Sequence, residues 1–157
     1  MNIQVIAIGK TDSKALALLI SEYAKRLGHY VNFEMLWLPD IKNTKALSEK
    51  NQKLQESQLI LKKVKPSDHL ILFDEKGKTY SSVDFSEHLQ KRMNSGLKQL
   101  IFVIGGPYGF DESLYQRAQE KISLSKMTFS HQMVRLLVVE QIYRAFTILR
   151  NEPYHHR

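Results

Sequence analysis

The chain has 157 residues, of which 43% are hydrophobic and 25% charged, as expected for one globular domain with a proper core. It contains no cysteine, which excludes disulfides, thiolate metal sites and cysteine nucleophiles and favours a reducing cytoplasm. The net charge of +7 favours a polyanionic partner, with RNA or DNA ahead of a membrane surface; the alternative is a protein that is basic without binding a polyanion.

Strands and helices are predicted to alternate along the chain. In the first half, the patterns predict a strand over 3–8, a helix over 13–27, a strand over 31–38, a lysine-rich helix over 44–64, a strand over 70–73 and a turn over 74–77. In the second half they predict a helix from a capping box at 81–84 to Gly96, a strand over 100–104, a helix over 111–121, an extended or looped segment over 123–129 and a helix over 131–149. No basic leader precedes the first strand and no apolar run approaches about 18 residues, so we expect neither a signal peptide nor a membrane span.

This alternation predicts a single α/β domain over 1–157, with a mostly parallel sheet flanked by helices on both sides. Ligands of such sheets bind beyond the carboxyl ends of the strands, in the loops that lead to the helices. The sequence "IGGPYG" occupies such a position, directly after the strand predicted over 100–104. We therefore expect a ligand at this loop.

The glycine loop, Gly105-Gly106-Pro107-Tyr108-Gly109, matches neither common nucleotide fingerprint. Gly9-Lys10-Thr11 has the end of a P-loop, but Gln4 stands where the first glycine is required. The dinucleotide pattern G-x-G-x-x-G is missing after the first strand, and Pro107 removes an amide donor from the second candidate. A loop interrupted by proline is better suited to a fixed turn against the flat face or ribose of an adenosine, while the alternative is a purely structural turn.

The second half of the chain resembles the RlmH family in the order of its motifs. The strand is followed by "IGGPYG", then "SLSKMTFSH", "RLLVVEQIYRAF" and a terminal "PYHHR", and the likeness extends to "AIGK" and "SEYAKRL" near the start. The resemblance implies a SPOUT α/β fold with a C-terminal trefoil knot, a cytoplasmic homodimer and S-adenosylmethionine as the cofactor. It implies methylation of N3 of a pseudouridine in 23S ribosomal RNA of assembled ribosomes, with no metal and no membrane. The alternative is a non-catalytic basic protein that binds RNA or the ribosome.

The resemblance places the cofactor among three loops, where apolar side chains pack on adenine and backbone groups bared by glycine read its edges. The implied cofactor-binding residues are Phe73, Gly105, Gly106, Leu124, Ser125, Lys126, Met127, Thr128 and Phe129. For the apolar members the alternative is ordinary core packing. Ser130 departs from the family, which often has proline there, and serine at this position can cap the last helix.

The last thirty residues hold four arginines and no lysine, and arginine suits bidentate phosphate contacts and stacking on bases. We expect His155 as the general base for the N3 proton, Tyr154 to orient the uracil ring, and Arg144 in the active site. The resemblance implies that the tail folds over the cofactor site. The candidate substrate-binding residues are Arg135, Arg150 and His156.

Some polar residues have a structural alternative. Arg135 and Glu140 could equally form a buried or intersubunit ion pair, and Arg144 could form a structural salt bridge. His29, His69 and His88 are expected at the surface or at helix caps, and the histidine spacing predicts no metal site.

Overall fold

A computed structural model describes residues 1–156 and shows a five-stranded sheet in which every neighbouring pair is parallel. In order across the sheet the strands are β2 (Asn32–Leu38), β1 (Asn2–Ile8), β4 (Gln99–Ile104), β3 (His69–Thr79) and β5 (Glu120–Ser123). The helices are α1 (Lys14–Leu27), α2 (Glu49–Leu61), α3 (Ser82–Asn94), α4 (Glu112–Arg117) and α5 (His131–Leu149), with a short 3-10 helix, η1 (Thr44–Ala46). The predicted α/β architecture is confirmed.

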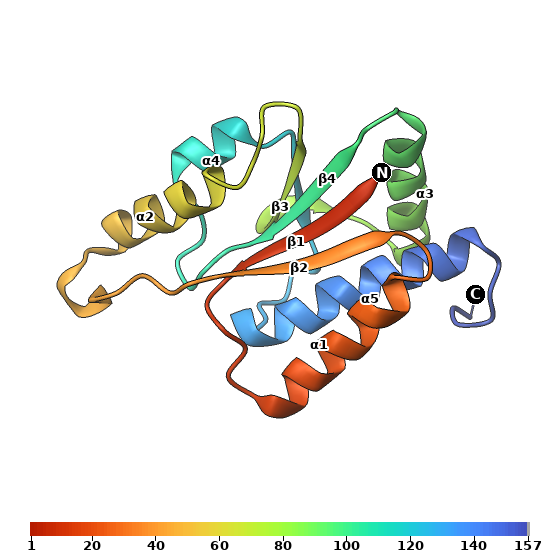
Figure 1. Ribbon diagram of the computed structural model, residues 1–157, viewed down its shortest axis with the longest axis horizontal. Coiled ribbons are helices and arrows are strands. Elements are labelled where there is room, and N and C mark those ends of the chain that lie inside the picture. Colours follow the sequence, from red (N-terminus) through yellow and green to blue (C-terminus); the bar gives the residue numbers. More distant parts are fainter. Residues whose placement is uncertain (157) are drawn as a thin grey trace.

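Helices cover both faces of the sheet (Figure 1). Helices α1, α3 and α5 lie on one face, and their apolar side chains share a core with alternate residues of β1 and β4, such as Val5 and Phe102. Helices α2 and α4 lie on the other face, where Ile60 and Leu114 pack against the remaining residues of the same strands. The central strand β4 is apolar over 100–104 because both of its faces are buried.

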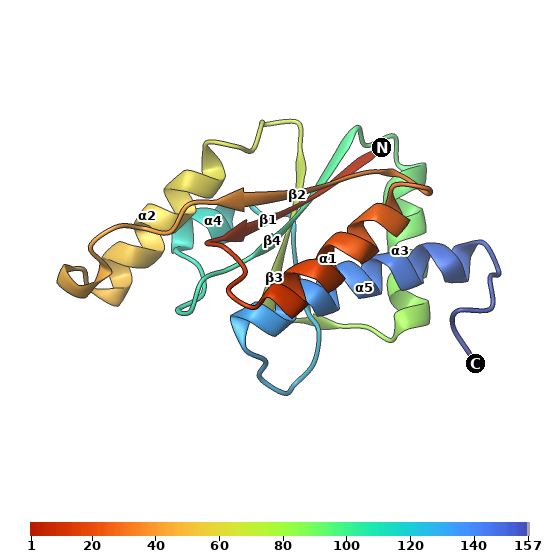
Figure 2. The same cartoon turned by 60° about the horizontal axis from the view of Figure 1, so that its bottom comes forward.

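Helix α5 runs beside α1 and carries the C-terminus away from the sheet (Figure 2). Its first turn lies at the carboxyl edge of the sheet, where Gln132 accepts a hydrogen bond from the backbone N–H of Asp12 at 2.9 Å. Its last turns lie near the end of α1, where the Tyr30 ring stacks on Phe146. The two ends of α5 therefore belong to different parts of the molecule. None of the helices within 1–156 combines the length and the apolarity needed to cross a membrane.

The predicted beginnings of three helices are confirmed, and in each of them a serine caps the first turn. The hydroxyl oxygens of Ser13, Ser81 and Ser130 each accept a hydrogen bond from the backbone N–H three residues later. The helix predicted over 44–64 is wrong in its first turn: η1 ends before Leu47, and Ser48 caps a new helix that begins at Glu49. Serine at this position stops and restarts the helix because its side chain binds the backbone.

The bounds of two predicted elements in the second half differ from the structure. The turn predicted over 74–77 lies within β3, which continues to Thr79, yet these four residues have no strand partner: Phe73 and Lys78 both pair with Ile122, and the Asp74 carboxylate accepts from the backbone N–H of Lys76. Gly77 makes this pairing possible, since a Cβ there would lie 2.5 Å from the backbone of Ile122. The helix predicted over 111–121 is too long, because α4 ends at Arg117 and the chain then forms β5.

His69 and His88 are not surface or capping residues but meet around Glu120, which is also half-buried. One carboxylate oxygen of Glu120 lies 2.5 Å from Nε2 of His69 and 2.9 Å from Nε of Arg92, and the other lies 2.8 Å from Nε2 of His88. Although burial opposes ionisation, the imidazoles of His88 and His69 and the charge of Arg92 lower the pKa of Glu120 to about 2. Glu120 thus remains ionised as an anchor between β5, β3 and α3.

Replacing Glu120 by Gln is expected to lower the free energy of unfolding at pH 7 by about 2 kcal/mol, since a buried ion cluster loses its anion. The folded pKa is below the ordinary value of 4.5, so the stabilisation is present above that pH and is lost as the pH falls towards 2. Urea denaturation at pH 7 and pH 3 measures both effects. Glu87→Gln, an exposed control on α3, should change stability by less than about 0.5 kcal/mol; equal losses in the two variants would contradict the anchor.

Candidate active site

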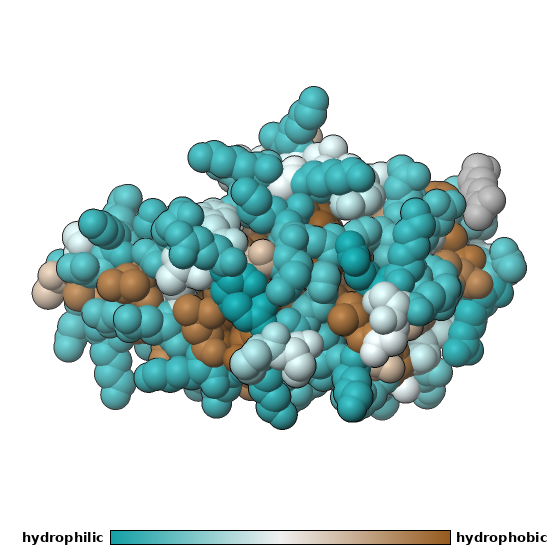
Figure 3. All heavy atoms as spheres, turned by 90° about the horizontal axis from the view of Figure 1, so that it is seen from above, coloured by the Kyte–Doolittle hydropathy of each residue, from teal (hydrophilic) through white to brown (hydrophobic). Residues whose placement is uncertain are grey.

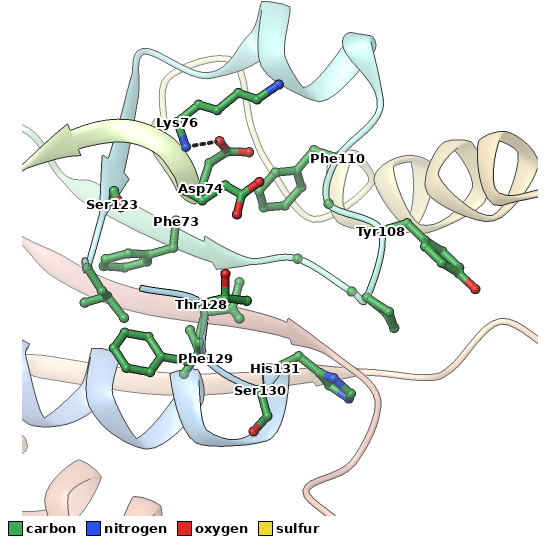
Figure 4. A pocket seen from close by; sticks show the side chains of 18 of the residues that line it. Phe73, Asp74, Lys76, Tyr108, Phe110, Ser123, Thr128, Phe129, Ser130 and His131 are labelled. Carbon is green, nitrogen blue, oxygen red and sulfur yellow. Dashed lines mark hydrogen bonds between the residues drawn. The ribbon is translucent and has the colours of Figure 1, made fainter. Parts of the chain in front are cut away.

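A cavity of about 670 Å³ opens at the carboxyl end of β4, beside the point at which the pairing of β3 with β4 ends at Phe73, and this is the edge where the parallel sheet was expected to bind a ligand. Its walls come from residues 73–76 of β3, the loop after β4, the loop between β5 and α5, and the first turn of α5 (Figure 4). Phe73 and Phe129 lie on one side of this space, and Tyr108 points away from it. The volume is in the range of pockets that hold small molecules and cofactors.

Eight of the nine predicted cofactor-binding residues line this cavity. They are Phe73, Gly105, Gly106, Leu124, Ser125, Met127, Thr128 and Phe129. Lys126 is exposed and is not among the lining residues. The structure therefore brings together three loops that the sequence separates by as much as 50 residues, while whether they bind a cofactor remains a prediction.

The glycine loop forms a tight turn around its proline. The backbone N–H of Gly109 donates to the carbonyl of Gly106 at 3.2 Å, with Pro107 at the second position of the turn and Gly109 at φ 79°. The glycines at 105 and 106 also pack closely within the protein: a Cβ on Gly105 would lie 3.1 Å from the Phe110 ring, which would have to shift slightly to accommodate it.

The loop between β5 and α5 is held by its own serines. The buried hydroxyl of Ser123 donates to the carbonyl of Ser125 at 2.8 Å, and the Ser125 hydroxyl oxygen accepts from the N–H of Met127 at 3.0 Å. These bonds fix a turn that leaves the Met127 side chain 74% exposed at the rim of the cavity. Ser130 ends the loop as the cap of α5, so serine serves where the resembling family often has proline.

Acidic and aromatic groups of the cavity wall, Asp74 and Tyr115 among them, were not predicted from the sequence. Asp74 follows Phe73 directly, and its carboxylate accepts hydrogen bonds from the Tyr115 hydroxyl and, at 2.8 Å, from the backbone N–H of Lys76. Burial and the contact with Asp74 raise the pKa of Tyr115, so its phenol remains a donor. A signal was present, because Asp74 lies at the carboxyl end of a buried strand, but the residues 74–77 were interpreted as a turn.

The C-terminal tail packs on its own α1 and α5. The Tyr154 hydroxyl donates to Glu140 at 2.9 Å and lies 3.0 Å from the hydroxyl of Tyr23, while its ring meets the edge of Tyr143. Burial and these two hydrogen bonds raise the pKa of Tyr154, so its phenol stays protonated at neutral pH. Tyr154 can therefore orient a partner or stack on it, but it is not a base.

Arg144 organises the tail from α5. It forms an ion pair with Glu140 at 2.6 Å, its guanidinium lies 4.7 Å from the centre of the Tyr154 ring, and its Nη1 lies 3.3 Å from Nδ1 of His155. Because arginine only donates, Nδ1 of His155 accepts, and the proton of a neutral imidazole then lies on Nε2. The three residues predicted to act in catalysis are thus brought together around Glu140.

The cluster of Arg144, Tyr154 and His155 does not reach the cavity of the same chain. The cavity is lined by the first turn of α5, whereas the tail lies beside the C-terminal half of this helix (Figure 2), and α5 is about 28 Å long. Within 1–156 none of the tail residues lines the cavity. Arg150 stacks over the Tyr30 ring at 4.7 Å and His156 is exposed, so both also lie at this far end.

Arg135 is 2% exposed and ties α5 to the loop after β1. Its guanidinium donates to the carbonyl of Ile8 at 2.5 Å and to the Thr11 hydroxyl at 3.2 Å, and it lies over the Trp37 ring. Burial lowers its pKa, and nearby aspartates oppose that shift. Arg135 forms no ion pair with Glu140 in this chain, and its position is that of a structural link rather than a surface for RNA.

Comparisons with known proteins relate the chain to methyltransferases. A family model described as "Predicted SPOUT methyltransferase" matches residues 1–155. A protein of Flavobacterium johnsoniae named ribosomal RNA large subunit methyltransferase H is 65% identical over 157 residues, the full length of both chains. Proteins with the same name from Christiangramia forsetii and Bacteroides thetaiotaomicron are 63% identical over 100% of both chains and 49% identical over 99% of both chains.

Proposed function

The chain belongs to the SPOUT methyltransferase family, and from this premise we propose that it transfers a methyl group from S-adenosylmethionine to N3 of a pseudouridine in large-subunit ribosomal RNA. The observation that carries the proposal is the cavity, whose walls contain eight of the nine residues expected to hold the cofactor. The proposal includes a cytoplasmic homodimer acting on assembled ribosomes and the trefoil knot that the resemblance implies.

The residues of the cavity suit S-adenosylmethionine. Phe73, Leu124 and Phe129 offer apolar surface for adenine, and Asp74, which also lines the cavity, offers a negative charge to a cationic ligand. S-adenosylmethionine, when bound, supplies an activated methyl group. Calorimetry with S-adenosylmethionine and with ATP tests the site, and binding of neither would favour the alternative of a non-catalytic RNA-binding protein.

The chain's own residues must hold the uracil ring and take up the proton of N3. We assign ring orientation to Tyr154, which stays protonated, and proton uptake to His155, whose neutral form suits a base near pH 7. Since Nδ1 of His155 accepts from Arg144, and Nε2 then carries the proton, His155 serves as the base only after Arg144 releases Nδ1.

The tail completes the site of a second copy of the chain. Because the tail and the cavity lie at opposite ends of α5, a two-fold axis across this helix brings each tail to the other cavity. An apolar surface suits such contact: Leu18 is 72% and Leu19 42% exposed on α1, and Met133 is 42% exposed on the adjacent α5. The proposed active site is thus shared between two protomers.

A basic surface beside the cavity suits the RNA backbone. Seven lysines lie between Lys42 and Lys65, and six of them are exposed, whereas Lys53 lines the cavity. In this segment one acid, Glu49, is exposed and the other, Glu56, is buried. Viewed from above, the molecule is predominantly hydrophilic, with small separate apolar patches (Figure 3). We propose that this lysine surface docks the phosphates next to the target base.

Ribosome affinity is expected to fall steeply with salt, by about 100-fold or more between 50 and 200 mM, because phosphate contacts release counterions. The double variant Lys50→Glu and Lys62→Glu should bind more weakly and show a shallower salt dependence. Filter binding at several salt concentrations measures both. A matched control, Lys91→Glu with Lys98→Glu, changes the same charge away from α2; an equal loss of affinity in that control would contradict a localised surface.

A further inference from the structure

Beneath the glycine loop lies a carboxyl group that the proposed mechanism does not use. Glu56 of α2 is 4% exposed, and its oxygen Oε2 is buried without a hydrogen-bond partner among the described residues. Its other oxygen accepts a hydrogen bond from Gln52 at 3.0 Å. Burying a carboxylate oxygen without a hydrogen-bond partner costs free energy of folding, so a role for Glu56 other than stability is worth examining.

The unpartnered oxygen faces the turn of the glycine loop. A Cβ on Gly106 would lie 2.6 Å from Oε2 of Glu56, so a side chain at position 106 would require the buried carboxyl group to move. Gly106 itself lines the cavity, whereas Glu56 is not among the lining residues. The neighbouring Ser57, also buried, accepts a hydrogen bond from the backbone N–H of Asp111 at 3.1 Å, where the loop ends. Helix α2 thus supports the loop at two points.

We propose that Glu56 is a positioning residue of the cofactor site, whose buried carboxyl group holds the Gly105–Gly106 segment at the height that keeps the cavity open for S-adenosylmethionine. This inference rests on the proposed function, because it takes the cavity to be the cofactor site. Glu56 acts through Gly106 and does not touch the ligand. The carboxyl group of Glu56 has room only because Gly106 has no side chain, and Glu56 in turn supports the loop by packing against Gly106.

Burial and the neighbouring carboxylate of Asp40 favour the neutral form of Glu56. Burial raises its pKa, the hydrogen bond from Gln52 opposes that shift, and the carboxylate of Asp40, in the segment after β2, adds to it. Lys53, one turn earlier on α2, lines the cavity. Ionisation would put a charge without a partner on the oxygen that faces Gly106. Cofactor affinity should therefore be highest where Glu56 is neutral and decline as the pH rises through its raised pKa and the group ionises.

A double-mutant cycle read by calorimetry with S-adenosylmethionine tests the contact. Gly106→Ala should weaken binding about tenfold or more in the wild-type background, because the new methyl group collides with the carboxyl group. In the Glu56→Ala background the same change should cost less than about twofold, since the obstacle is gone. Additive losses would overturn the proposal. If the Glu56→Ala variant does not fold, the same double-mutant cycle can be measured with Glu56→Ser, which also removes the carboxyl group but keeps a polar side chain.

The pH dependence separates positioning from simple stability. Glu56→Gln keeps the shape without the charge, so its affinity should match that of the wild type at low pH, where Glu56 is neutral, and should stay constant as the pH rises and the wild type weakens. Glu49→Gln, an exposed control on α2, should retain the wild-type profile. Identical pH profiles of wild type and Glu56→Gln would refute the role. If the folded wild type bound no S-adenosylmethionine at all, the proposed function itself would fail, which is a different result.

Discussion

A chain that ends at Pro153 is expected to fold and to bind S-adenosylmethionine, yet to transfer no methyl group to ribosomal RNA, a loss of at least about 1,000-fold. The truncation removes Tyr154 and His155, to which the proposed mechanism assigns orientation and proton uptake. The core is spared, because the tail packs on the outer faces of α1 and α5. A tritiated-methyl transfer assay on ribosomes that lack the modification, followed by mapping of the base, measures the effect.

The same truncation shows which protomer supplies the tail. A truncated chain with an intact cavity, mixed with a full-length chain whose cavity is blocked, should regain activity in the mixed dimer, since the tail reaches only the partner's site. Each preparation alone should be inactive. Full activity of the truncated chain by itself would remove the tail from the mechanism, and inactivity of a verified mixed dimer would contradict its action on the partner.

Replacing Gly105 by Val is expected to reduce the affinity for S-adenosylmethionine by about 100-fold or more, because the site loses both its shape and its volume. The Cβ alone would lie 3.1 Å from the Phe110 ring, and the two methyl groups of valine have to displace that ring or the backbone of the loop. Both Gly105 and Phe110 line the cavity, so either movement reshapes it. Calorimetry with S-adenosylmethionine gives the affinity, and thermal unfolding gives the stability.

A glycine far from the cavity provides the control. Gly96 has a φ of 78°, and a Cβ added there would meet none of the described atoms within 4 Å, so Gly96→Ala should cost stability but leave cofactor affinity unchanged. Unchanged affinity in Gly105→Val would count against the cavity as the cofactor site. A loss of affinity in both variants would show that stability, and not the site, was measured.

The elements with strong local signals were predictable from the sequence. Strand β4 is a continuous apolar run followed by glycine, and α5 is a long periodic helix that starts at the capping residue Ser130. The glycine loop after β4 was predicted from its glycines and proline, because these residues are typical of turns. These signals depend on neighbours in the chain, so they can be read without knowing the fold.

The elements that were missed depend on contacts between distant residues. Strand β5 has four residues with one strongly apolar side chain, Ile122, and becomes a strand because β3 offers it a free edge. The same pairing resumes at Lys78, so that residues 74–77, whose sequence is typical of a turn, form an unpaired irregularity within β3. Short strands of this kind carry little local information, because their hydrogen-bond partners lie about fifty residues away.

The candidate site was predictable in its parts but not in its arrangement. The cavity residues followed from the family resemblance, whereas the reasons for the two glycines, Phe110 above one and Glu56 beneath the other, required the fold. The cluster of His69, His88 and Glu120 was also hidden, since its members come from three separate elements. Buried charges meet through topology, which spacing along a chain does not encode.

The order of strands in the sheet has a consequence for synthesis on the ribosome. Strand β4 lies between β1 and β3, which do not pair with each other, although both precede it in the chain. A nascent polypeptide of 98 residues therefore holds two separate fragments that only the next six residues can join. The sheet can therefore assemble only after β4 has been synthesised and has inserted between β1 and β3. The glycine loop is the next segment of the chain to be synthesised.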